Sequence, residues 1–180
     1  WHFRWRLHQA RHDAAAMAIA RIGRGSGEKA NAAALLQPYL HPEVPPEMGF
    51  EGQLIQRDGV WAATRLLEGS PAEALGAMRF LLERPGAGEP RQARQIPRSA
   101  AIWSLPTTFR SSGRKGIEAA GPLLDEEGHA SIRTGMLSLG IAARGSCDDG
   151  VRAALDPYLT HGNGALRDVA NVALGFAFQG

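Results

Sequence analysis

Apolar side chains recur every three or four residues over much of the chain, with polar residues between them. The pattern is clearest over residues 130–143 and 165–178, where the apolar positions mark one face of a helix. Gly and Pro interrupt the pattern at intervals, and no stretch of useful length alternates between apolar and polar residues. The sequence therefore predicts an all-α protein, with helices of about 10–15 residues joined by short loops.

Four weaker segments show the same spacing and group into two further helix pairs. The pairs are Val60–Leu67 with Ala72–Leu82, and Ser99–Leu105 with Gly116–Leu124. Residues 41–57 contain Pro42, Pro45 and Pro46, and this composition predicts a loop. We therefore expect helical repeat units in residues 1–40, a Pro/Gly-rich loop or shortened insertion over 41–57, and continuing helical repeats over 58–180.

The chain contains internal repeats. The tripeptide Pro-Tyr-Leu follows an apolar helical segment twice, at residues 38–40 and 157–159. A Leu-Gly pair ending at Gly140 is followed five residues later by Gly145, and the pair ending at Gly175 is followed in the same way by Gly180. Because one helix pair cannot bury its own apolar face, such repeats predict pairs that stack and share a core.

The recurring glycines predict two structural roles. Gly25, Gly145 and Gly180 follow apolar helical segments, where glycine readily adopts the left-handed conformation that ends a helix. Gly140 and Gly175 lie within the predicted helices, where a glycine costs about 1 kcal/mol relative to Ala. We expect these two positions to allow close approach of a neighbouring helix.

Two features of the repeat unit resemble the proteasome/cyclosome (PC) repeat family. The segment Ile132–Ala142 resembles the first helix of that repeat, and the Pro-Tyr-Leu helix resembles the second. The segment Gly88-Glu89-Pro90, followed by Arg91–Arg94 and Pro97, is similar to a repeat boundary in the large non-ATPase base subunit of the proteasome regulatory particle. The resemblance implies a HEAT-like α-α superhelix that forms an arc of a toroid.

The resemblance also implies a function. Members of the family are non-catalytic scaffolds, so the implied partners are proteasome ATPase subunits, ubiquitin receptors and the ubiquitin-like domains of shuttle factors. The implied setting is a large hetero-oligomer in cytoplasm and nucleus. Three alternatives remain open at this point: the second large PC-repeat subunit, a HEAT-repeat adaptor outside the proteasome, and a helical array that binds nucleic acid.

Charge adds two candidate partner surfaces. The net charge is +2, but residues 84–115 carry seven basic groups and one acidic group. Arg91, Arg94 and Arg98 in this stretch could contact an acidic partner. Only Trp103 and Phe109 accompany them, and nucleic-acid stacking platforms need more aromatic residues among the charges. The acidic run of Asp125, Glu126 and Glu127 could contact a basic partner or complement a helix start.

The sequence offers no catalytic, metal or cofactor site. Cys147 is the only cysteine, which excludes a disulfide framework, and the two acids after it disfavour a reactive thiolate. His8 and His12 are spaced for one helix face but lack a third ligand nearby. We therefore expect no enzyme activity and no cofactor.

Composition sets the remaining limits. The chain has 180 residues, of which 44% are hydrophobic, which excludes disorder of the whole chain. No apolar run reaches the ~18 residues that a membrane-spanning helix requires. The chain starts at Trp1 without an initiator Met, so we expect it to be a piece of a longer product.

Overall fold

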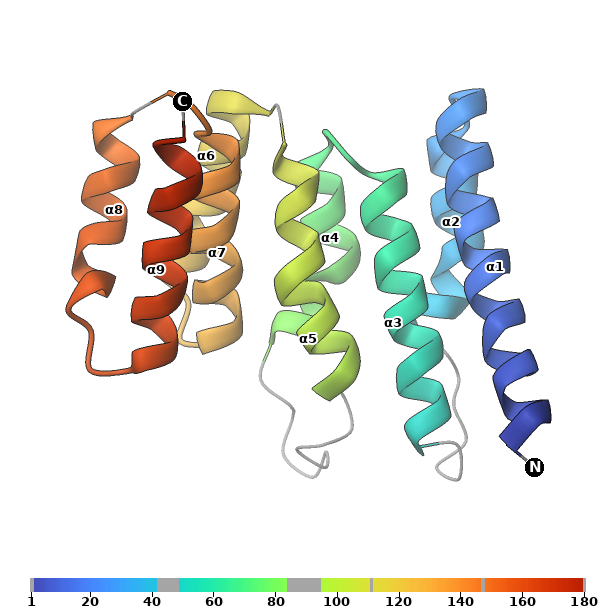
Figure 1. Cartoon of the computed structure of the whole chain (residues 1–180). Helices are drawn as coiled ribbons and strands as arrows, with labels where there is room; N and C mark the ends of the chain where they lie inside the picture. The colour runs from blue at the N-terminus through green and yellow to red at the C-terminus, as the bar shows by residue number, and fades with distance from the viewer. Residues whose placement is uncertain (1, 42–48, 84–94, 111, 147, 180) are drawn as a thin grey trace.

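The computed structural model describes residues 2–41, 49–83, 95–110, 112–146 and 148–179. Within these ranges, side chains are described from residue 10 onward. Every regular element in the described part is a helix, so the protein is all-α (Figure 1). The elements in chain order are α1 (His2–Ser26), α2 (Lys29–Leu40), α3 (Gly49–Leu66), α4 (Pro71–Leu82), α5 (Gln95–Ser104), the 3-10 helix η2 (Leu105–Phe109), α6 (Gly113–Ala120), the 3-10 helix η3 (Gly121–Leu124), α7 (His129–Ala142), α8 (Asp149–Leu159) and α9 (Gly164–Ala177).

The odd-numbered helices form a continuous row. Helix α1 contacts α3, α3 contacts α5, α5 contacts α7, and α7 contacts α9. These five helices run in the same direction, and α2 and α4 lie behind them in Figure 1. Helix α2 packs on α1 and α3, α6 packs on α7, and α8 packs on α9. One face of the odd-numbered helices is therefore left exposed.

The buried side chains form two hydrophobic clusters rather than one. The first lies mainly among α1 to α5, and the second lies mainly among α6 to α9. The short helix η2 contributes to both, because Leu105 belongs to the first cluster and Phe109 to the second. Leu75 of α4 packs against both clusters. The row of helices is thus held together across η2 and α4.

The two Pro-Tyr-Leu segments occupy equivalent places at the ends of their helices. Pro38 lies in the last turn of α2, and Pro157 lies in the last turn of α8. Their tyrosines differ in their contacts. The backbone of Tyr39 lies against Gly59 of α3, where any Cβ would come within 2.8 Å of the Tyr39 carbonyl carbon. The hydroxyl of Tyr158 donates to the carbonyl of Leu124 at 3.0 Å.

The expected loop over residues 41–57 differs from the structure. Helix α3 begins at Gly49, so residues 49–57 are helical, while residues 42–48 lie outside the described residues. Leu54 is buried at 6% exposure, and Gly52 is buried as well. Packing of this face outweighs the cost of about 1 kcal/mol for a glycine inside a helix. Helix α3 is accordingly 18 residues long, beyond the expected length.

The glycines differ in what they do. A Cβ on Gly140 would lie 2.8 Å from the Cα of Ala173 in α9, whereas a Cβ on Gly175 would meet nothing within 4 Å. Gly145 has a φ of 73°, and its N–H donates to the Ala177 carbonyl at 3.1 Å. Gly25 does not end α1, because the helix continues to Ser26 and the positive φ of 78° is at Gly27. Gly180 lies outside the described residues.

Candidate functional site

Of the three arginines of the predicted basic surface, only Arg98 lies within the described residues. Arg91 and Arg94 lie outside the described residues. Arg98 of α5 is half-buried, and its Nη2 donates to the carbonyl of Leu82 at 3.0 Å. This carbonyl is the last of α4, where backbone acceptors lack partners inside the helix. Arg98 therefore closes the end of a helix.

The predicted acidic surface lies in the turn before α7. Glu126 pairs with Arg79 of α4 at 2.6 Å, and its side chain is only 23% exposed. Asp125 and Glu127 are exposed on either side of it. Glu126 is thus engaged within the chain.

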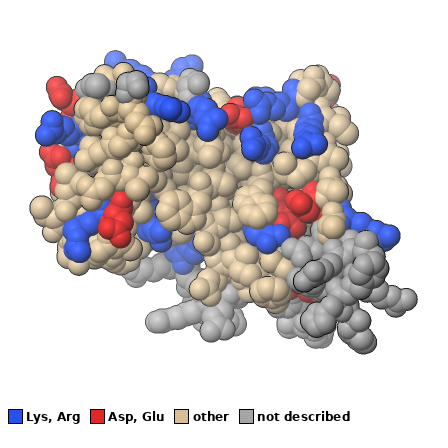
Figure 2. All heavy atoms as spheres, viewed as in Figure 1, with Lys and Arg blue, Asp and Glu red and all other residues tan. Residues whose placement is uncertain are grey.

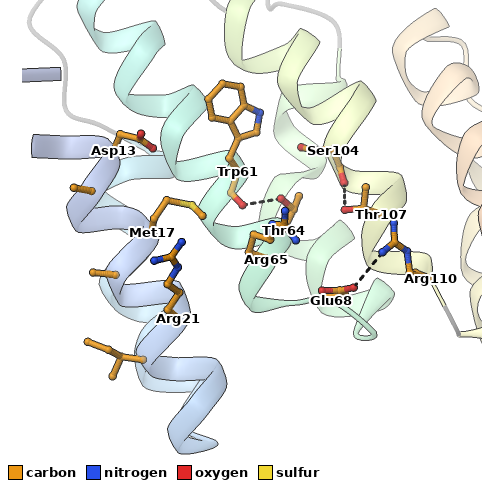
Figure 3. Close-up of a pocket in the computed structure, with 13 residues that line it drawn as sticks. Asp13, Met17, Arg21, Trp61, Thr64, Arg65, Glu68, Ser104, Thr107 and Arg110 are labelled. Carbon is orange, nitrogen blue, oxygen red and sulfur yellow. Dashed lines mark hydrogen bonds and ion pairs between the residues drawn. The ribbon is translucent and has the colours of Figure 1, made fainter. Parts of the chain in front are cut away.

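A groove that the sequence did not predict lies on the exposed face of the odd-numbered helices. It has a volume of about 930 Å³ and lies between α1 and α3, with η2 and the end of α5 closing one side (Figure 3). Asp13, Met17 and Arg21 line it from α1. Their spacing of four residues puts them on one helix face.

The opposite wall of the groove comes from α3. Trp61, Thr64 and Arg65 line it at positions i, i+3 and i+4, and Glu68 extends the wall from the turn after α3. Trp61 is 41% exposed, and across from it at the end of α1 Ile22 is 70% exposed. Large apolar side chains left exposed beside a groove indicate a binding surface more than isolated ones do.

The hydroxyl groups in the groove are already engaged by backbone. Thr64 Oγ1 donates to the Trp61 carbonyl at 2.8 Å, and Thr107 Oγ1 donates to the Ser104 carbonyl at 2.6 Å. Ser104 Oγ in turn donates to the Ala100 carbonyl at 2.7 Å. These residues sit on their own helices in the usual back-bonded arrangement of Ser and Thr. None of the three is paired with a general base in the described structure.

The charges of the groove are concentrated at one end. Glu68 receives Arg24 at 2.6 Å and Arg110 at 4.0 Å. Arg21 and Arg65 are also exposed there, and neither makes an ion pair within the described part of the chain. Figure 2 shows Lys and Arg side chains gathered along the upper part of this face, over the ends of α1, α3 and α5. This end of the groove is therefore positively charged.

A second groove of about 710 Å³ adjoins the first between α3 and α5, and the two share Trp61, Ser104 and Thr107. Trp103 on its wall is 55% exposed. The guanidinium of Arg57 lies 4.5 Å from the centre of the Trp61 ring, and that of Arg133 lies 5.5 Å from the Trp103 ring. Both distances are within the range of cation–π contacts, which hold the two indoles in place.

One carboxylate is buried behind the grooves. Asp58 of α3 is fully buried, and its Oδ1 accepts from Arg57 Nε at 2.9 Å and Nη2 at 2.6 Å. Its Oδ2 has no hydrogen-bond partner within the described structure. Burial raises the pKa of Asp58, and the hydrogen bond and charge of Arg57 oppose that rise. Arg57 therefore links the buried carboxylate to the exposed ring of Trp61.

Of Cys147, His8 and His12, which the sequence singled out, only His12 has a described side chain. Among the residues that the structure describes, no three His, Cys, Asp or Glu side chains are grouped so as to hold a metal ion. Cys147 and the side chain of His8 lie outside the described part. His12 packs edge-on toward Tyr39, with ring centroids 6.2 Å apart. None of the described helices is long and apolar enough to span a membrane.

Two comparisons with known proteins found no match. No family model matches the chain, and no curated protein matches it. The class of protein is therefore set by its own geometry: an all-α protein built from consecutive helices, with a grooved face that carries exposed indole and guanidinium groups.

The signal that could have identified the groove was present in the sequence. Positions 61, 64, 65 and 68 form a helix face that mixes an indole, a hydroxyl and two charges, unlike the apolar faces that mark the core. The facing positions of α1, from 13 to 22, also mix apolar side chains with two charges, Asp13 and Arg21. The pairing of these two faces depends on the contact between α1 and α3, which periodicity alone does not indicate.

Proposed function

We propose that this protein is a non-catalytic scaffold that docks a protein partner on the grooved face of α1, α3 and α5. The observation that carries the proposal is the pair of exposed tryptophans, Trp61 and Trp103, in adjoining grooves. Trp and Arg dominate the energetic centres of protein interfaces, because they bury large areas at a small conformational cost. Here each indole is already held by an arginine.

The test compares two variants that both remove exposed apolar surface. Trp61→Ala/Trp103→Ala alters the grooved face, whereas Leu35→Ala alters α2, where Leu35 is 62% exposed. Tagged wild-type protein, expressed in its source cells, is expected to retain a defined set of proteins by quantitative mass spectrometry. The double variant should lose that set and Leu35→Ala should keep it. Retention of the same set by the double variant would refute docking at this face.

The sequence resemblance extends the proposal to a particular assembly, the proteasome regulatory particle. A scaffold of this class would contact the ATPase ring and present ubiquitin receptors and shuttle factors, in cytoplasm and nucleus. What supports this extension is the residue resemblance over Ile132–Ala142 and at the Pro-Tyr-Leu segments. Proteasome ATPase subunits among the retained proteins would support it. A retained set without them would favour a helical adaptor outside the proteasome.

Nucleic-acid binding is a second candidate function, favoured by one observation. Arginines lie over two exposed indoles, and base stacking on such rings is the usual mode of single-strand binding. Fluorescence titration with single-stranded DNA at two salt concentrations tests it. Salt-sensitive binding that Trp61→Ala/Trp103→Ala abolishes would support this function, and the absence of binding at low salt would exclude it.

A further inference from the structure

We propose that the groove between α1 and α3 binds an acidic peptide segment of the partner that carries an apolar anchor side chain. The inference rests on the proposed docking function and specifies the chemistry of the partner. The lining changes along the groove: arginines gather at one end, and Met17 and Trp61 lie about one helical turn from them on α1 and α3, with Asp13 beyond Met17.

The less basic part of the groove is lined by Met17 of α1, whose side chain extends toward α3, and by Trp61 of α3, whose indole projects away from Arg65 and Glu68 (Figure 3). Met17 is half-buried, and its flexible thioether adapts to side chains of different shape. The indole of Trp61 is held from outside by Arg57 at 4.5 Å and gives a rigid wall. An aliphatic or aromatic side chain placed between them would be shielded from water on two sides.

The basic end is formed by Arg21, Arg65 and Arg110, together with Arg24. Among the described residues that line this end, Glu68 is the only one with a carboxylate, and it already receives Arg24 and Arg110. Asp13 lies about two turns or more before these arginines on α1, toward the end of the groove where Trp61 lies. Arg21 and Arg65 therefore remain available, and a guanidinium binds a carboxylate through two parallel hydrogen bonds.

A structural role accounts for part of this charge. Arg24 and Arg65 lie in the last turns of α1 and α3, where a cation complements the negative end of the helix dipole. Arg21 lies about one turn earlier, outside the last turn, and makes no ion pair in the described structure. The helix dipole therefore does not explain Arg21, whereas a bound carboxylate would pair with both Arg21 and Arg65.

Charge complementarity selects the acidic peptide over other occupants. A basic or neutral segment would leave Arg21 and Arg65 unpaired next to the bound chain, which disfavours it. A nucleic acid would also satisfy the arginines and could stack a base on Trp61, so single-stranded DNA serves as the competitor in the test below. An apolar anchor followed by carboxylates about one to two helical turns away matches the order of groups along the groove.

A charge-swap experiment tests the inference. The probes are three short fluorescein-labelled peptides that each contain one Leu. The acidic peptide otherwise consists of Glu, Asp and Ser. In the neutral peptide Gln and Asn replace the acids, and in the Lys peptide Lys replaces them. Fluorescence anisotropy should show that the wild-type chain binds the acidic peptide at least about tenfold more tightly than the neutral one. The Arg21→Glu/Arg65→Glu variant should lose the acidic peptide and gain the Lys peptide.

The control variant carries the same change of charge elsewhere. Arg144→Glu/Arg152→Glu alters two exposed arginines in the α7–α8 region, and it should bind the acidic peptide as the wild type does. Circular dichroism and thermal melting confirm that each variant is folded. Replacing Leu by Ser in the acidic peptide should weaken its binding, because the anchor pocket is then empty.

Two results would overturn the inference. One is equal binding of the acidic and neutral peptides. The other is that single-stranded DNA displaces the acidic peptide and binds more tightly than the peptide does, both to the wild type and to the Met17→Ser variant. Either result leaves the docking function itself to be judged by the capture experiment with Trp61→Ala/Trp103→Ala, so the two failures are distinguishable.

Discussion

Two glycines in similar sequence contexts have opposite surroundings at the residue scale. Gly140 of α7 faces the backbone of Ala173, and a Cβ there would lie 2.8 Å from the carbonyl carbon and the Cα of that residue. Gly175 of α9 faces open space. The sequence places both after a leucine in a helix, so their surroundings follow from the packing of α7 against α9.

These surroundings predict opposite effects of alanine. Gly140→Ala should lower the free energy of unfolding by about 1–3 kcal/mol, because backbone atoms of α9 must move to admit the methyl group. Gly175→Ala should leave stability unchanged or raise it by up to about 1 kcal/mol, through better helix propensity. Urea denaturation measures both. Equal effects of the two substitutions would contradict the close approach of α7 and α9.

Asp58 predicts a pH dependence of stability. Burial raises its pKa in the folded state above the ordinary value of 3.8, so the folded protein holds this proton at pH values where the unfolded chain has released it. The contribution of Asp58 is therefore most favourable below pH 3.8 and declines as pH rises from there to the raised folded pKa.

The measurement is the difference in unfolding free energy between the wild type and Asp58→Asn across this range. Asn does not titrate, so the stability of the wild type relative to the variant should fall as pH rises through the window. If the stability of the wild type relative to the variant instead rises with pH, the pKa of Asp58 is lowered in the folded state. The ion pair with Arg57 would then outweigh the effect of burial.

At the element scale, helix starts depend on particular caps. The Asp148 carboxylate accepts from the N–H groups of Gly150 and Val151 at 2.8 and 3.1 Å, at the start of α8. Asn163 accepts from Ala165 N–H at 2.9 Å at the start of α9. Each cap satisfies backbone donors that have no partner inside the helix.

Removal of the α8 cap should therefore destabilise the protein. Asp148→Ala is expected to cost about 1 kcal/mol, within the usual range for loss of an N-cap. Asp156→Ala serves as the control, because Asp156 is exposed in the interior of α8 and makes no hydrogen bond or ion pair in the described structure. Thermal unfolding of both variants provides the comparison. If Asp156→Ala lowers stability by the same amount, the loss in Asp148→Ala is due to the change in net charge and not to the cap.

Much of the helix content could be predicted from periodicity, because the apolar faces of α7 and α9 bury into one cluster. The start of α3 could not, because prolines and glycines dominate residues 41–52 and mask the apolar face that begins there. The grooves were also missed. Their walls combine α1, α3 and α5, whose alignment is a product of tertiary packing.

At the scale of the whole molecule, the order of helices produces the docking face. The odd-numbered helices contact one another in turn and run in the same direction, so their C-terminal ends gather along one side (Figure 1). That alignment brings Arg21 of α1, Arg65 of α3 and Arg110, which follows η2, to one end of the groove. The even-numbered helices support the row from behind through the two hydrophobic clusters.

If the scaffold docks its partner as proposed, the partner covers the face formed by α1, α3 and α5. Hydroxyl-radical footprinting of the chain, alone and in complex with a partner retained in the capture experiment, tests it most directly. Ile22, Trp61 and Trp103 should lose reactivity in the complex, while Leu35 of α2 and Val172 of α9 keep theirs. Unchanged reactivity of both tryptophans, with protection at Leu35 or Val172, would contradict the account.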